Sequence, residues 1–137
     1  MGAGGLAGGL LGAAGDASAA AEDLPTLGVD AGRMPNIGRN VQSAIDEGQP
    51  SVLNRTTDPA LIRANRAAAC AGFCGPGSPD EYPFASTLQG GAGARVVAGV
   101  PLQEQFIQGA LLRNFYAKYG IGEGDPFQVI VTGLEGP

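Results

Sequence analysis

The chain has 137 residues, of which 44% are hydrophobic, so it is long enough to bury the core of one domain and too short for two. It contains no histidine and only two cysteines. This composition excludes the usual zinc sites, the Ser-His-Asp and Cys-His catalytic arrangements, and the zinc motif of nucleobase deaminases. The formal net charge is -5, which counts against a nucleic-acid partner because phosphate binding needs Lys and Arg.

The charges are unevenly distributed along the chain. All eight basic residues lie between positions 33 and 118 together with six acidic residues, so this region carries a net charge of +2 (8 − 6). The other seven acidic residues lie in the two terminal regions. The positive charge of this region therefore leaves binding to a nucleic acid as one of two interpretations. The alternative is that the scattered arginines form a solvated face, because no run of them is dense enough to be a basic patch.

Residues 1–29 are predicted to precede the folded domain, which we place at 30–137. The first 23 residues are almost wholly Gly, Ala, Leu and Ser, and such side chains offer little area to offset the entropy of ordering a backbone. We therefore expect a flexible Gly/Ala-rich linker. A secretory signal is the alternative, but no Lys or Arg precedes the apolar run and glycines interrupt it. No stretch reaches the roughly 18 unbroken apolar residues of a membrane span.

The first half of the domain predicts a helix and then a strand. Apolar residues recur at helical spacing from Ile37, Asn36 is placed to cap the helix and Gly48 to end it, so we expect a helix over about 37–47. The segment 51–56 is bounded by prolines and contains Val and Thr, which favours a short strand.

A second helix is predicted over 58–70. Asp58 is a good N-cap and Pro59 suits the first helical position, and strong helix formers follow. Cys70 and Cys74 lie on either side of a bend. This spacing slightly favours a local disulfide over two buried thiols in a reduced protein.

The second half of the domain predicts a hairpin, a helix and a last strand. Strands at about 81–88 and 94–100 are joined through a glycine-rich turn. A helix follows over about 102–119, and then an almost continuously apolar strand over 127–132. We therefore expect an α+β fold in which an antiparallel hairpin packs on a helix.

Three carboxylates fall around this hairpin and helix. Asp80 and Glu81 lie at the first strand, and Glu104 starts the helix with Gln108 one turn further on. Oxygen ligands without His or a thiolate pair favour Mg²⁺ or Mn²⁺. Such an ion stabilises the charge that develops when water attacks a phosphate, while a nearby carboxylate accepts the proton of the water. The spacing alone favours the alternative, a surface hairpin with solvated acids.

Several short motifs follow one another in the second half of the chain: DEYPFAST at 80–87, GG at 90–91, GA at 93–94, VP at 100–101, EQ at 104–105, QG at 108–109, FY at 115–116 and GDPFQVIV at 124–131. In this order and spacing they resemble the NucA/NucB deoxyribonuclease family over about residues 58–132. The resemblance implies a small ββα-metal nuclease domain related to the His-Me finger enzymes, in which an acid replaces the usual base histidine. A chain without histidine is consistent with that replacement.

The resemblance also implies roles for the acids and amides of these motifs. Asp80 matches the general base, and Glu81 matches the neighbouring acid that supports the catalytic site. Glu104 matches an acid at the helix start that is a candidate metal ligand. Gln105 stands where relatives often have Asn, and its longer amide is a second candidate for the metal.

A further set of residues is predicted to bind substrate. Gln108 matches a helical glutamine of the family, with a plain surface amide as the alternative. Ser86 and Thr87 offer hydroxyl groups to a phosphate, although hydroxyls on strands are more often structural. Arg95 is also predicted to bind substrate.

Domains of this type also resemble the C-terminal toxin domains of bacterial polymorphic toxins. That resemblance implies a DNA substrate, a cognate immunity protein, and secretion or delivery into a target cell as part of a larger toxin. Two other hypotheses stay open. One is a binding domain that keeps the fold but has lost its metal and its activity, and the other is an unrelated structural module with solvated acids.

Overall fold

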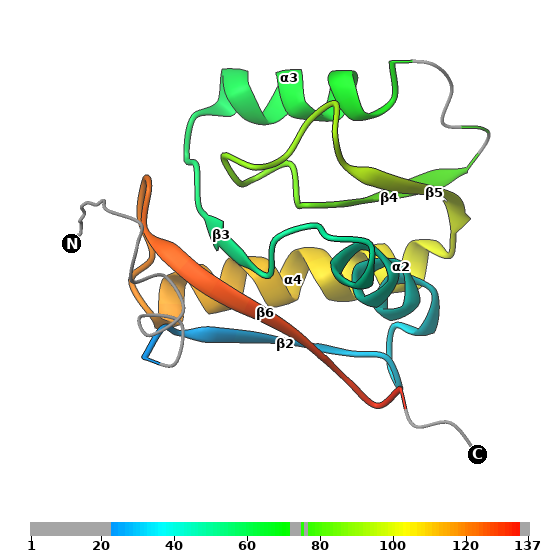
Figure 1. The fold of residues 1–137 in the computed structure, drawn as a ribbon, viewed down its shortest axis with the longest axis horizontal. Coiled ribbons are helices and arrows are strands. Elements are labelled where there is room, and N and C mark those ends of the chain that lie inside the picture. The colour runs from blue at the N-terminus through cyan, green and yellow to red at the C-terminus, as the bar shows by residue number, and fades with distance from the viewer. Residues whose placement is uncertain (1–22, 72–74, 76, 135–137) are drawn as a thin grey trace.

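The computed structural model describes residues 23–71, 75 and 77–134. The described chain forms the predicted α+β fold from three helices and two sheets (Figure 1). The flexible linker predicted for the first 23 residues falls almost wholly outside the described residues. The elements are β2 Thr26–Asp30, α2 Pro35–Asp46, β3 Val52–Asn54, α3 Pro59–Ala69, β4 Ser78–Tyr82, β5 Arg95–Val100, α4 Leu102–Lys118 and β6 Pro126–Thr132. Within the described residues, no helix combines the length and apolar character needed to cross a membrane.

The strands form one sheet of three strands and one of two. In the larger sheet β6 is central, parallel to β2 and antiparallel to β3. The smaller sheet is the antiparallel hairpin of β4 and β5, with a shift of register between Ser78 and Asp80. Figure 1 shows α2 and α4 between the two sheets and α3 on the outer side of the hairpin. Helix α2 contacts both sheets, and α4 contacts β2 and β4.

The hairpin begins earlier than the sequence predicts. The expected strand over 81–88 is wrong in its bounds, because β4 covers Ser78–Tyr82 and residues 83–88 form a loop. Pro83 follows β4 directly and has no N–H to donate to a neighbouring strand. The chain then turns, and Thr87 donates from its backbone N–H and its hydroxyl to the carbonyl of Phe84. This earlier start places Asp80 inside a strand.

Strand β2 is the element that the sequence pattern did not reveal. It covers Thr26–Asp30, so its first four residues lie in the segment 1–29 that we predicted to precede the domain. Leu27 and Val29 are almost completely buried, and the strand pairs along its whole length with β6. Residues 26–29 therefore belong to the folded domain, because a partner strand near the other end of the chain stabilises them.

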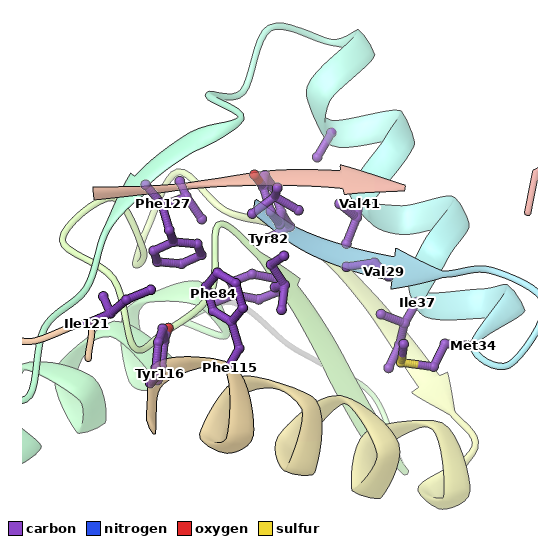
Figure 2. Packing of buried hydrophobic residues seen from close by; sticks show 14 of the residues in the cluster. Val29, Met34, Ile37, Val41, Tyr82, Phe84, Phe115, Tyr116, Ile121 and Phe127 are labelled. Carbon is purple, nitrogen blue, oxygen red and sulfur yellow. The ribbon is translucent and has the colours of Figure 1, made fainter. Parts of the chain in front are cut away.

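An aromatic cluster of the core lies between β6 and α4. Phe127 points from β6 toward α4, where Phe115 and Tyr116 meet it at 5.6 Å between ring centroids (Figure 2). Tyr82 of β4 and the following Phe84 also pack edge to face, at 5.2 Å. Aromatic pairs in these geometries are stabilised beyond the area that they bury. The core thus fixes the hairpin, α4 and the large sheet relative to one another.

Candidate active site

A pocket of about 220 Å³ opens between α3, β4 with its following loop, and α4. Five of the eight residues predicted from the sequence as site residues line it. The lining residues are Arg66, Pro79, Asp80, Glu81, Phe84, Ala85, Ser86, Gln105, Gln108, Gly109 and Leu112. The structure thus joins the DEYPFAST and QG motifs into one site.

Asp80 lines this pocket and is only 2% exposed. Successive side chains of a strand point to opposite faces, so Asp80 and Tyr82 both face the interior and Glu81 lies between them on the other face. Asn40 Nδ2 of α2 donates to Asp80 Oδ2 at 2.9 Å, and Gln108 Nε2 of α4 donates to Oδ1 at 3.0 Å. Two amides from different helices therefore hold the carboxylate.

Burial raises the pKa of Asp80 above the ordinary value of a carboxyl group. The hydrogen bonds from Asn40 and Gln108 act in the opposite direction, because they favour the charged form, while the negative charge of Glu104 adds to the rise. A carboxylate with a raised pKa is a stronger base than a solvated one, which suits it to accept a proton near neutral pH.

Two oxygen atoms beside Asp80 are buried and find no hydrogen-bond donor among the described residues. They are Oε1 of Glu81 and Oε1 of Gln108, and both residues line the pocket. Burial also raises the pKa of Glu81. The positive charge of Arg66 lowers this pKa, and the negative charge of Asp80 raises it further. A buried acceptor without a donor costs free energy, and in native proteins such an atom usually has an unseen partner such as a water or an ion.

These acceptors provide the chemistry of a site for a hard cation. Within the described residues, no group of three or more His, Cys, Asp or Glu side chains is placed to hold a metal. The carboxylates of Asp80 and Glu81 and the amide oxygen of Gln108 nevertheless supply oxygen ligands. Mg²⁺ needs only one or two carboxylates, because it keeps several of its waters. The donor set therefore fits Mg²⁺ or Mn²⁺.

Gln105 lines the pocket, but its amide nitrogen is already engaged. Its Nε2 donates to the carbonyl of Pro79 at 2.6 Å, at the start of β4. This bond links α4 to the strand that carries Asp80. The predicted metal contact of Gln105 stays a prediction, and the amide oxygen is the atom that would make it.

Glu104 lies outside the residues that line the pocket. Its Oε1 accepts from the backbone N–H groups of Asn36 and Ile37, both at 3.0 Å, and its Oε2 accepts from Asn36 Nδ2 at 2.7 Å. Helix α2 has no capping side chain of its own, and the free N–H groups of a first turn attract an acceptor with negative charge. Glu104 thus caps α2, and its predicted role as a metal ligand stays a prediction.

Two of the predicted substrate-binding residues are engaged elsewhere. Thr87 is completely buried, and its hydroxyl closes the turn onto Phe84. Arg95 donates from Nη1 to Asn40 Oδ1 at 2.7 Å, and its Nε lies 3.3 Å from Glu47 Oε2. Neither residue lines the pocket.

Ser86 does line the pocket, on the loop that follows β4. Its hydroxyl lies 2.8 Å from the hydroxyl of Tyr116, and the guanidinium of Arg55 lies over the Tyr116 ring, 4.2 Å from the centroid. Since a hydroxyl has one proton and two lone pairs, Ser86 keeps hydrogen-bonding capacity for a ligand. The structure thus places Ser86, unlike Thr87 and Arg95, in the lining of the pocket.

Sequence reasoning missed Asn40 and Arg66. Asn40 is 1% exposed and lies among Ile37, Val41 and Ala44 on the buried face of α2. A polar residue at an apolar position of a helix is the signal that identifies it, because buried amides need partners. Arg66 lies in the well-predicted α3, but nothing in its local sequence indicates that α3 passes beside Glu81.

The family model described as Deoxyribonuclease NucA/NucB matches the chain over residues 41–130. This range covers more than half of the chain and includes every residue that lines the pocket. Asn40, which holds Asp80, lies just before it. No curated protein matches the chain.

Proposed function

Because the chain belongs to the NucA/NucB deoxyribonuclease family, we propose that it hydrolyses phosphodiester bonds of DNA with the help of a divalent metal ion in the Asp80 pocket. One observation carries the proposal. A buried carboxylate held by two amides lies beside two buried oxygen atoms that have no donor. A base and a set of metal ligands are the two parts that such a hydrolysis needs.

Asp80 acts as the general base in this proposal. The amides of Asn40 and Gln108 fix its carboxylate, and its raised pKa makes it able to take the proton of an attacking water. The absence of histidine from the chain leaves carboxylates as the bases available near neutral pH.

Glu81 and Gln108 would hold the metal through the oxygen atoms that lack donors, with Gln105 as a further candidate. When bound, Mg²⁺ or Mn²⁺ would stabilise negative charge on the phosphate oxygens. Arg66 and Ser86 line the same pocket and have donors to offer to those oxygens. The charge of Arg66 also partly offsets that of Glu81, which reduces the repulsion of an approaching phosphate.

The experiment is cleavage of supercoiled plasmid by the purified protein with Mg²⁺, with Mn²⁺ and with EDTA. We expect nicked and linear products that need the metal, and loss of them in Asp80→Ala. Asp46→Ala is the matched control, because Asp46 is an exposed acid at the end of α2. Binding of DNA without cleavage would instead support the hypothesis of an inactive binding domain. Equal cleavage by the wild type and Asp80→Ala would contradict the role of Asp80.

We extend the proposal to a delivered toxin domain, supported only by the resemblance of the sequence to such domains. Expression in a bacterium that lacks a protective partner should then stop growth and degrade the chromosome. Asp80→Ala should abolish both effects. An immunity protein would bind the wild type and protect the cell, and growth unaffected by an active enzyme would contradict the toxin role.

A further inference from the structure

We propose that Asn40 and Arg95 form a brace that fixes the direction of the Asp80 carboxylate, so that Asn40 is a positioning residue for catalysis. The proposal rests on the function proposed above. Asn40 Nδ2 donates to Asp80 Oδ2 at 2.9 Å and lies 3.4 Å from the Asp80 carbonyl. The same nitrogen donates to the carbonyl of Arg95 at 3.2 Å. One amide therefore contacts both strands of the hairpin and the proposed base.

The orientation of the Asn40 amide is fixed by Arg95. A guanidinium group has only donors, so the atom that faces Arg95 Nη1 at 2.7 Å must be the amide oxygen. The amide nitrogen must then face Asp80. Gln108 lacks such a restraint, because its Oε1 has no partner in the part of the chain that the structure describes. Rotation of either amide would lose its hydrogen bond to Asp80, but rotation of Asn40 would also lose the hydrogen bond from Arg95.

The backbone rather than an ion pair holds Arg95 in place. Arg95 pairs with Tyr82 across the hairpin, two residues beyond Asp80 on β4. Its contact with Glu47 joins side chains that are 34% and 60% exposed, and ion pairs of this kind contribute little. Glu47 therefore provides a control: it touches the brace without holding it.

Glu104 helps to position Asn40, the other residue of the brace. It caps the first turn of α2 at Asn36 and Ile37, and Asn40 follows Asn36 by one helical turn on the same side. The contact between α4 and α2 thus sets where Asn40 meets β4. Because Asn40 lies outside the range matched by the family model, the match itself assigns it no role.

Loss of the brace should reduce turnover more than binding. Asn40 does not line the pocket, so substrate has no contact to lose, whereas a displaced base lowers the rate of the chemical step. A misplacement of about 1 Å in a catalytic group costs on the order of 100-fold in rate. For Asn40→Ala we therefore expect kcat to fall by about 10–100-fold, with KM within about twofold of the wild type.

Asn40→Asp separates positioning from space-filling. It keeps the shape of the side chain and the acceptor that faces Arg95, but it presents an acceptor rather than a donor to Asp80. We expect it to be at least as inactive as Asn40→Ala. Arg95→Leu should reduce kcat as well, and the double variant Asn40→Ala/Arg95→Leu should be no worse than the poorer single variant, because the two residues act as one unit. Glu47→Gln should retain activity.

A measurement that does not depend on cleavage keeps the proposal falsifiable. By NMR, the side-chain amide protons of Asn40 should exchange slowly with solvent in the wild type and faster in Arg95→Leu. Fast exchange in the wild type would overturn the brace even in an active nuclease. Slow exchange in a protein that does not cleave DNA would leave the brace intact and contradict the proposed function. Full activity in Asn40→Asp, or a loss confined to KM, would also overturn the brace.

Discussion

The two sheets of the molecule bury different kinds of side chain. The sheet of β2, β6 and β3 contributes only apolar groups to the core: Leu27, Val29, Leu53, Phe127 and Val129. Strand β4 of the hairpin buries Asp80 beside Tyr82, and two buried oxygen atoms near it lack donors. The large sheet therefore supplies apolar packing, whereas the hairpin carries a buried carboxylate that amides of α2 and α4 hold in place.

The helices between the sheets join these two regions. Helix α2 places Val41 in the apolar core and the preceding Asn40 on Asp80. Helix α4 in the same way packs Phe115 on Phe127 and directs Gln108 to Asp80. Each helix therefore uses packing against the large sheet to aim an amide at the hairpin.

Asp80→Asn should give the sharpest separation of activity from stability. We expect DNA cleavage to fall by about 10²–10⁴-fold, the usual contribution of a general base, while the melting temperature is unchanged or higher. The substitution removes a buried charge, and the Gln108 amide is free to turn its Oε1 toward the new amide. Cleavage rates and thermal unfolding of the same preparation test this. A marked loss of stability would contradict the comparison between the sheets.

Phe127→Ala should have the opposite profile. Its ring is fully buried against Phe115 and Tyr116, and deletion of a buried phenyl ring costs about 3–5 kcal/mol. Urea unfolding should show this loss, while the protein that remains folded at low temperature keeps its metal requirement. Ile130→Ala is the matched control on the same strand, because Ile130 is 42% exposed, and it should change stability by less than about 0.5 kcal/mol.

Glu104→Gln decides between the two roles of Glu104. As a cap, Glu104 accepts three hydrogen bonds from Asn36 and Ile37, and an amide cannot accept all of them with the same geometry. We expect a loss of about 1–2 kcal/mol in the free energy of unfolding and little change in the metal concentration that gives half-maximal cleavage. A large rise in that concentration with unchanged stability would instead support the metal-ligand role predicted from the sequence.

The sequence predicts the elements that carry local signals. Asp58 and Pro59 mark the start of α3, and Asp58 Oδ1 indeed accepts from the backbone of the first turn. Strand β2 was not predicted, because its stability comes from pairing with β6, in which Thr26 lies opposite Gln128. A pairing between two ends of a chain has no local signature.

In the candidate site, too, the local motifs were predictable from the sequence and the contacts between distant segments were not. The motifs predicted that Asp80, Glu81 and Gln108 share one site, and the three residues do line one pocket. They could not show that Glu104 finds its donors at the start of α2, 68 positions earlier in the chain. They also could not show that Asn40 completes the hydrogen bonds of Asp80, because both contacts depend on how α2 packs.

Glu123 and Asp80 should give opposite pH dependences, and that of Glu123 is the smaller. The backbone N–H of Thr57 and the hydroxyl of Thr56 donate to Glu123, and these bonds lower its pKa below the ordinary value of 4.5. A lowered pKa contributes stability above the unfolded pKa that is lost as the pH falls. The pKa of Asp80 is raised, so its contribution is present at low pH and is lost as the pH rises.

Free energies of unfolding at several pH values between about 3 and 7 should therefore separate the two carboxylates. Glu123→Gln should flatten the loss of stability on the acidic side, and only slightly, because the side chain is exposed and solvent screens its contacts. Asp80→Asn should instead remove the decline on the neutral side and leave the acidic side unchanged. If both substitutions acted on the same side, the buried carboxylate of the hairpin would be stabilising like the exposed one, and the contrast between the two regions would fail.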